Sequence, residues 1–174
     1  MGWRPARELD WQAVYKDQLP RVYNYLRFRI GNQADVEELT SRTFEKAWRS
    51  RDQYRRDLAG FSTWLFTIAQ NVAIDHLRSH RAHLPLEAAL DVVTIETPHD
   101  DAERDSNLER LAALMRHLSQ RDQEVVALKY GAELTNREIA RLTSLSESNV
   151  GTLLHRAVRE LRSGWDSQES RHER

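Results

Sequence analysis

Apolar residues recur at three- and four-residue steps through most of the 174-residue sequence, and this spacing limits the possible fold more than any other feature. In residues 61–81, for example, the apolar positions are Leu65, Ile68, Ala69, Val72 and Leu77. Steps of three and four place such residues on one face of an α-helix. The sequence has only six glycines and four prolines, so few residues interrupt helices. We therefore predict an all-α fold.

The helical pattern occurs in two blocks with a stretch of different composition between them. Residues 84–110 hold eight acidic side chains and two basic ones, together with Pro85 and Pro98, and most of this stretch has no helical periodicity. Such a segment is expected to be flexible and self-repelling. The sequence thus predicts two small helical domains, at residues 1–83 and 108–165, a flexible acidic linker at 84–107 and a disordered tail at 166–174.

The overall composition narrows the class of protein. The formal net charge is -1, but the acidic middle masks two ends that are neutral to basic, so an anionic partner remains compatible with the chain. The sequence has no cysteine, no apolar run long enough to cross a membrane and no signal-peptide pattern at its start, from which we expect a cytoplasmic protein. We find no phosphate-binding glycine loop, nucleophile elbow or paired apolar carboxylates, so neither an enzyme, a cofactor nor a small-molecule substrate is expected.

Residues Thr135 to Leu161 have the layout of a helix-turn-helix: a short helix, a turn at Thr143–Leu145 and a longer helix. The N-terminal end of the longer helix would face base edges in the major groove, and its later cations would meet phosphates. The residues expected to contact DNA are Arg137, Ser146, Glu147, Ser148, Asn149, Thr152, His155 and Arg156. A plain helical hairpin inside a core is the alternative. Gly151 either permits close approach to the DNA backbone or is simply tolerated.

Three stretches, in this order, resemble the extracytoplasmic-function (group IV) sigma factors of the sigma-70 family. They are DVEELTSRTF at 35–44 with AWR at 47–49, FSTWLFTIAQNVAIDHLR at 61–78, and LSQRDQEVVAL at 118–128 leading to LHRAVRELR at 154–162. The resemblance implies that residues 1–83 are sigma region 2 and residues 108–165 are sigma region 4. It also implies promoter recognition, DNA strand opening and transcription initiation.

The resemblance further implies partners and the residues that contact them. The expected partners are core RNA polymerase, through the clamp of its β′ subunit and the flap of its β subunit, promoter DNA, and an anti-sigma factor. Residues expected to bind core polymerase are Asp35, Glu38, Leu39, Phe44 and Trp48, with Ser41 where the family usually has glutamine. Region 4, with the residues of the helix-turn-helix, would bind the upstream promoter element.

The helix at residues 61–81 resembles the element that reads the opened downstream promoter strand. Capturing unstacked bases requires aromatic surfaces for base faces, amides for base edges and cations for phosphates. Residues of these types, expected to contact the downstream element, are Arg55, Phe61, Trp64, Asn71, Asp75, His76, Arg78 and Arg81. The alternative is a solvated charged helix whose tryptophan faces the core.

Three alternatives are weighed against this interpretation: a metal site, a regulator and a scaffold. His76, His80 and His83 follow each other at helical steps, but no carboxylate or thiolate nearby completes a ligand set, so no metal site is predicted. Two other functions compete with that of a sigma factor. One is a helix-turn-helix regulator with a sensory or dimerising N-terminal domain, and the other is an interaction scaffold without a DNA role. A regulator would bind its DNA alone, whereas a sigma factor generally needs core polymerase.

Overall fold

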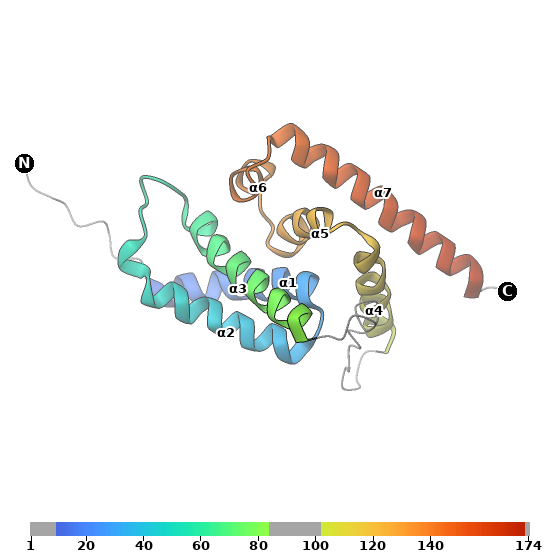
Figure 1. Cartoon of the computed structure of the whole chain (residues 1–174), viewed down its shortest axis with the longest axis horizontal. Helices are drawn as coiled ribbons and strands as arrows, with labels where there is room; N and C mark the ends of the chain where they lie inside the picture. Colours follow the sequence, from blue (N-terminus) through green and yellow to red (C-terminus); the bar gives the residue numbers. More distant parts are fainter. Residues whose placement is uncertain (1–9, 84–101, 173–174) are drawn as a thin grey trace, which may run out of the picture.

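The computed structural model describes residues 10–83 and 102–172. In these two ranges the backbone forms seven α-helices and two shorter helical turns, and no strand (Figure 1). The predicted all-α fold is therefore confirmed. None of the helices in the described ranges is both long and apolar enough to cross a membrane.

The N-terminal part consists of three long helices. These are α1 at Trp11–Ile30, α2 at Gln33–Arg49 and α3 at Phe61–His83, with the short turn η1 at Arg51–Gln53 after α2. Asp10 caps α1 by accepting hydrogen bonds from two backbone amides, and Gly31 ends it with φ of 85°, a conformation that glycine adopts without steric cost. Asn32 caps α2 by accepting a hydrogen bond from the amide of Asp35. The three helices pack on one another around residues such as Tyr25 and Phe66.

The C-terminal part contains four helices. They are α4 at Ala102–His117, α5 at Gln120–Val126, α6 at Asn136–Thr143 and α7 at Glu147–His172, and the π-helical turn η2 at Ala127–Gly131 follows α5 directly. Ser119, Thr135 and Ser146 each stand just before a helical pattern in the sequence, which predicts N-caps at these positions, and all three caps are present. In the turn between α6 and α7, Ser144 adopts a left-handed conformation with φ of 57°. The helix-turn-helix layout is confirmed, with its turn one residue later than expected.

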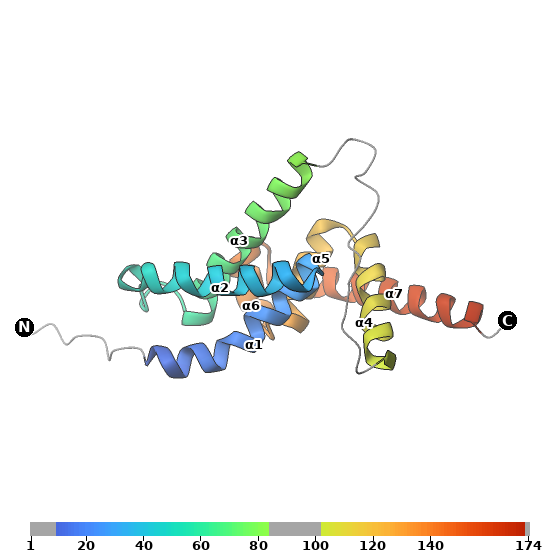
Figure 2. The same ribbon diagram turned by 90° about the horizontal axis from the view of Figure 1, so that it is seen from below.

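The two parts lie in direct contact. α6 lies beside α3 (Figures 1 and 2), and η2 packs along α1. Buried residues from both parts form one hydrophobic cluster. Gly131 permits this approach, because a Cβ atom at that position would lie 2.8 Å from the Cα of Tyr25. The two domains predicted from the sequence are therefore held together by their own contacts, in addition to the chain that joins them.

Two helix ends differ from the expected boundaries. α4 begins at Ala102, so residues 102–107, expected in the linker, are helical, whereas residues 84–101 lie outside the described residues. α7 continues to His172 through the expected tail, and Gly164 does not end it. A Cβ at Gly164 would lie 2.6 Å from the Cδ2 of Leu114, so this glycine permits close packing of α4 on α7. The Arg110 guanidinium of α4 also stacks on the ring of Trp165, which supports the last turns.

Candidate DNA and polymerase interfaces

The α2 residues predicted to bind polymerase divide into buried and exposed groups. Leu39 is 1% exposed and Phe44 is 9% exposed, and the Phe44 ring packs edge-on against Tyr15 at 4.7 Å. These two side chains belong to the core, which corrects their assignment to an apolar surface. Trp48, at 50% exposed, faces solvent, as does Glu38. Asp35 is half-buried and does not cap α2, because Asn32 holds that position.

Aromatic side chains gather at the N-terminal end of α3. Phe61 and Trp64 are half-buried and lie 5.5 Å apart between ring centroids. Trp11 contacts both rings, and Tyr54 packs on Trp64 at 5.2 Å. Trp48 completes the group through an edge contact with Trp11 at 5.4 Å. We call Trp11, Trp48, Tyr54, Phe61 and Trp64 the aromatic cluster; it joins a predicted polymerase residue to two predicted DNA residues.

Sequence reasoning did not place Trp11 and Tyr54 in this cluster, although their residue type was the available signal. Burial raises the pKa of Tyr54 above its usual value. The Tyr54 hydroxyl donates a hydrogen bond of 3.3 Å to the backbone oxygen of Ala59. Trp64 and Phe66 do not both fit the apolar stripe of residues 61–81, so the sequence predicts that one of them faces outward. Phe66 is fully buried, so Trp64 is the residue that reaches the surface.

The connector between α2 and α3 carries exposed charge. Arg55 donates two hydrogen bonds to the Asp57 carboxylate, at 2.9 and 2.7 Å. The hydrogen bond from Arg55 lowers the pKa of Asp57 below its usual value. Because both side chains are exposed, this ion pair can exchange for a phosphate at small cost. Arg55 thus remains available to DNA in the predicted role.

The outward face of α3 carries most of the residues predicted to read the downstream element. Asn71, Asp75 and Arg78 are exposed, and none of the helices in the described ranges covers them. The side chain of Arg81 lies outside the described residues. His76 is half-buried instead, because its ring turns toward α2 and lies 3.6 Å from the Asp35 carboxylate.

This last contact corrects the expectation that no carboxylate completes a ligand set with the histidines. Asp35, His76 and His80 bring one ligand atom each to within 4.8 Å of one another. The sequence placed the histidines one turn apart but did not reveal Asp35, which belongs to another helix. The side chain of His83 lies outside the described residues.

The start of α7 presents a row of exposed polar residues. Ser146 caps the helix by accepting a hydrogen bond from the Asn149 amide at 3.1 Å. Glu147, Ser148, Asn149, Thr152 and His155 are all exposed, as the DNA-reading role requires. Arg137 of α6 is also exposed and lies 4.0 Å from the Glu147 carboxylate.

Gly151 of α7 has a role that the sequence left open. A Cβ at Gly151 would meet only the Asn136 side chain, at 3.9 Å, so packing within the chain does not require glycine there.

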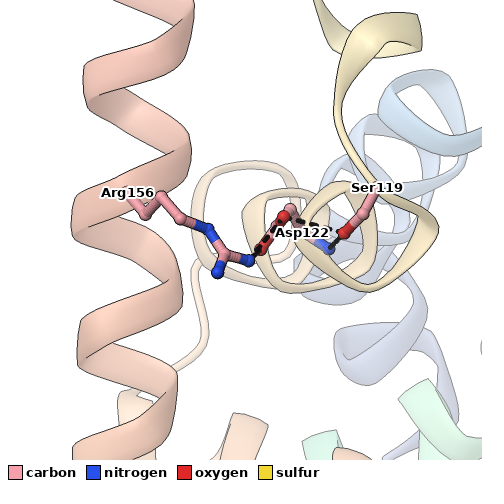
Figure 3. A network of polar contacts seen from close by, with 3 residues as sticks. All are labelled: Ser119, Asp122 and Arg156. Atoms are coloured by element: carbon pink, nitrogen blue, oxygen red, sulfur yellow. Dashed lines mark hydrogen bonds and ion pairs between the residues drawn. The ribbon is translucent and has the colours of Figure 1, made fainter.

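Arg156 of α7 was expected to contact phosphate. In the structure, Arg156 donates hydrogen bonds at 2.7 and 2.8 Å to Asp122, which is 4% exposed and is also held by Ser119 (Figure 3). The Arg156 side chain is itself 55% exposed, so its contact with phosphate stays a prediction.

A polar network joins the two parts of the molecule, and sequence reasoning missed it. The Glu124 carboxylate accepts hydrogen bonds from the Tyr25 hydroxyl and the Gln70 amide, both at 2.9 Å, and pairs with Arg29 at 2.7 Å. Burial, followed by the charge of Glu124, raises the pKa of Tyr25 well above its usual value. Arg21 adds a hydrogen bond of 2.8 Å to the backbone oxygen of Ala132. These contacts hold α5 and η2 against the N-terminal helices.

A three-helix unit with an exposed polar helix face, followed by a capped helix-turn-helix, defines a two-part protein of the DNA-binding class. The family model described as Sigma-70 region 2 matches residues 14–83, and the one described as Sigma-70, region 4 matches residues 108–161. The chain belongs to the sigma-70 family, in its extracytoplasmic-function group.

Individual relatives agree with this assignment. The extracytoplasmic-function RNA polymerase sigma factor BldN of Streptomyces coelicolor is 34% identical over 160 residues, which cover 90% of this chain and 61% of BldN. This chain thus spans less than two thirds of BldN. The sigma factor SigW of Bacillus subtilis is 28% identical over 164 residues, covering 88% of this chain and 86% of SigW.

A solved structure supports the fold. The sigma factor RpoE of Bartonella quintana, in complex with the anti-sigma factor NepR, matches with a TM-score of 0.73 at 18% identity, covering 90% of this chain and 97% of RpoE. Together, the two family models and the sigma factors among the relatives assign promoter-directed transcription initiation to this chain.

Proposed function

We propose that this sigma factor binds core RNA polymerase through the α2 surface, reads the downstream promoter element with α3 and reads the upstream element with the start of α7. The observation that carries the proposal is the exposure of both polar rows, Asn71 to Arg78 on α3 and Glu147 to His155 on α7. Each row projects from a rigid helix whose opposite face is buried in the core. Rigid presentation of amides, hydroxyls and cations is what base-edge and phosphate contacts need.

On α2, the surface proposed to bind the clamp of the β′ subunit consists of Glu38 and Trp48. Arg51 stacks on the Trp48 ring at 4.3 Å and fixes its orientation. An exposed tryptophan is typical of residues that contribute strongly to protein interfaces. Leu39 and Phe44 also belong to α2, but their side chains are buried and anchor the helix in the core. Region 4 is the part proposed to meet the flap of the β subunit.

Strand opening is proposed to depend on α3 and the aromatic cluster. Phe61 and Trp64 are half-buried but reach the surface at the end of α3, where an unstacked base can pack on an aromatic face. Asn71 lies exposed on the same helix and offers an amide to a base edge. The exposed Arg55 and Arg78 supply charge for the backbone of the displaced strand.

An anti-sigma factor is a further proposed partner. The similar RpoE structure contains the anti-sigma factor NepR, and its match to 90% of this chain includes both helical parts. An anti-sigma factor is therefore proposed to bind the arrangement in which region 2 and region 4 touch.

The test compares DNA binding with and without core polymerase. The purified chain alone should give weak, salt-sensitive binding, and specific promoter binding should appear when core polymerase is added. Asn71→Ala should reduce strand opening more than it reduces formation of the closed complex. Strand opening is measured by the permanganate reactivity of unpaired thymines. Specific binding by the chain alone would instead identify a helix-turn-helix regulator.

A further inference from the structure

Three metal-ligating side chains from two helices meet on region 2. Asp35 lies in the first turn of α2, and His76 and His80 lie one turn apart on α3. Their ligand atoms all fall within 4.8 Å of one another, and the Asp35 Oδ2 to His76 Nε2 distance is 3.6 Å. Two ligands on a tetrahedral zinc ion, each about 2.0–2.1 Å from the metal, lie about 3.3 Å apart. The three groups thus need only small side-chain movements to share one ion.

From this juxtaposition we propose that Asp35, His76 and His80 form a binding site for a divalent transition metal, of which Zn²⁺ is the representative. Imidazole nitrogens with one carboxylate oxygen form a donor set that suits zinc, copper and nickel and does not suit Mg²⁺ or Ca²⁺. Three protein ligands leave one coordination position for water or another ligand. The proposal is independent of the role in transcription, because it concerns the free chain.

The surroundings of the histidines prepare them for this role. The two imidazole rings lie 4.0 Å apart between centroids, so they stand next to each other on α3. Burial, followed by the neighbouring His80, lowers the pKa of His76 below its usual value.

Outer contacts of the cluster follow the pattern found at protein metal sites. A histidine that binds metal through one ring nitrogen commonly donates a hydrogen bond from the other to a carbonyl oxygen. His80 Nδ1 lies 3.3 Å from the backbone oxygen of His76 and so has such a partner. Glu38 and Arg42 also act on His76, with charges of opposite sign. The net charge facing the ion is therefore set by the Asp35 carboxylate.

Metal at this site would join α2 to α3 at a position near both proposed interfaces. Asp35 was predicted to meet polymerase and His76 to meet DNA, and a shared ion would fix both side chains in the orientation seen here. A metal-loaded chain should consequently resist thermal unfolding more than the metal-free chain, because a ligand that binds only the folded state stabilises it.

The experiment titrates the full chain, freed of any histidine tag, with Zn²⁺ by calorimetry and with Co²⁺ by visible absorption. We expect binding of one ion per chain and intense absorption bands typical of tetrahedral cobalt. The variants Asp35→Asn, His76→Gln and His80→Ala should each weaken Zn²⁺ binding by about tenfold or more, the loss that even outer-contact mutations can cause. His117→Ala, which removes an exposed histidine of α4, is the matched control and should bind as the parent does.

The outcomes separate the proposal from its alternatives. Circular dichroism of each variant establishes that its helices are intact, and His80→Ala is the safest substitution because that side chain is exposed. Loss of binding in both histidine variants with full retention in Asp35→Asn would overturn the three-ligand site and leave a helix histidine pair. Equal binding by the parent and all three variants, or no binding by the parent, would overturn it entirely.

Discussion

The Tyr25 hydroxyl of α1 donates a hydrogen bond of 2.9 Å to the Glu124 carboxylate of α5, across the boundary between sigma regions 2 and 4. Arg29 and Gln70 bind the same carboxylate, and the Arg29 and Glu124 side chains are only 7% and 15% exposed. A charge buried to this degree is costly when its partner is removed. Removing one member of this network should therefore weaken the contact between the two regions.

Glu124→Ala should separate the two regions. The substitution leaves the Arg29 guanidinium without its partner in a largely buried position and should destabilise the arrangement in which the two regions touch by about 3 kcal/mol. Small-angle X-ray scattering should record a larger radius of gyration. Glu160→Ala, which removes an exposed carboxylate from α7, should leave the radius unchanged. An unchanged radius in Glu124→Ala would mean that the apolar contacts between η2 and α1 suffice alone.

Arg156→Ala is expected to reduce the stability of region 4 more than it reduces the affinity for promoter DNA. Arg156 is the cation bound to the buried Asp122 carboxylate, and its loss should destabilise region 4 by about 2 kcal/mol, because a charged acceptor loses a hydrogen-bonding partner. Urea unfolding of the variant measures the loss. The salt dependence of promoter binding should change less than it does in a variant of a free phosphate contact. Unchanged stability of the variant, together with a weaker salt dependence of its promoter binding, would show that Arg156 mainly contacts phosphate.

Trp48→Ala should weaken the complex with core polymerase and leave the fold intact. Half of the Trp48 surface is exposed, so truncation removes contact area without opening the core. Leu39→Ala, in contrast, should cost about 2–5 kcal/mol of stability, because it leaves a cavity at a fully buried position. Co-purification with polymerase and thermal melting distinguish the two effects. Normal polymerase binding by Trp48→Ala would remove this residue from the interface.

These contrasts show which features could be predicted from the sequence. The caps at Ser119, Thr135 and Ser146 were predicted correctly because a cap is decided by residues within three positions of each other. The cap predicted at Asp35 was wrong, because Asn32, three residues earlier, takes that position. Burial was harder to predict. Leu39 and Phe44 belong to an apolar stripe that serves equally as a core face or an exposed interface, and only the packing of α1 and α3 distinguishes the two.

Contacts between residues distant in the sequence were not predicted. Neither the Tyr25–Glu124 hydrogen bond nor the approach of Asp35 to His76 has a local signal, because each joins side chains on different helices. The pairing of Arg156 with Asp122 has the same origin. Helix-turn-helix geometry alone places Arg156 toward DNA, and it does not reveal that α5 brings Asp122 within hydrogen-bonding distance. Prediction was thus more complete within helices than between them.

The His76 imidazole should give the chain a pH-dependent stability. Its pKa is lowered in the folded chain by burial and by His80, while Asp35 and Glu38 act in the opposite direction. Because the unfolded chain takes up this proton more readily, the stabilising contribution is present above pH 6.5, the ordinary value, and is lost as the pH falls through the lowered folded pKa. Urea midpoints measured at a series of pH values in metal-free buffer follow this loss.

His76→Gln should flatten that part of the pH profile, because glutamine does not titrate. His117→Gln provides the comparison, since it removes an exposed histidine from α4 and should leave the profile as it is in the parent. If the parent and His76→Gln lose stability identically between pH 7 and 5, another group is responsible for the pH dependence.

The most direct test of the central claim is in vitro transcription by purified core RNA polymerase on a library of promoter fragments, with and without this chain. The chain should produce transcripts that start at defined positions, from fragments sharing two sequence elements at a constant spacing. Asn149→Ala should change the preference for the upstream element, and Asn71→Ala should reduce output from all selected promoters. Transcription that does not depend on the chain, or a chain that selects DNA fragments without core polymerase and initiates from none of them, would contradict the account.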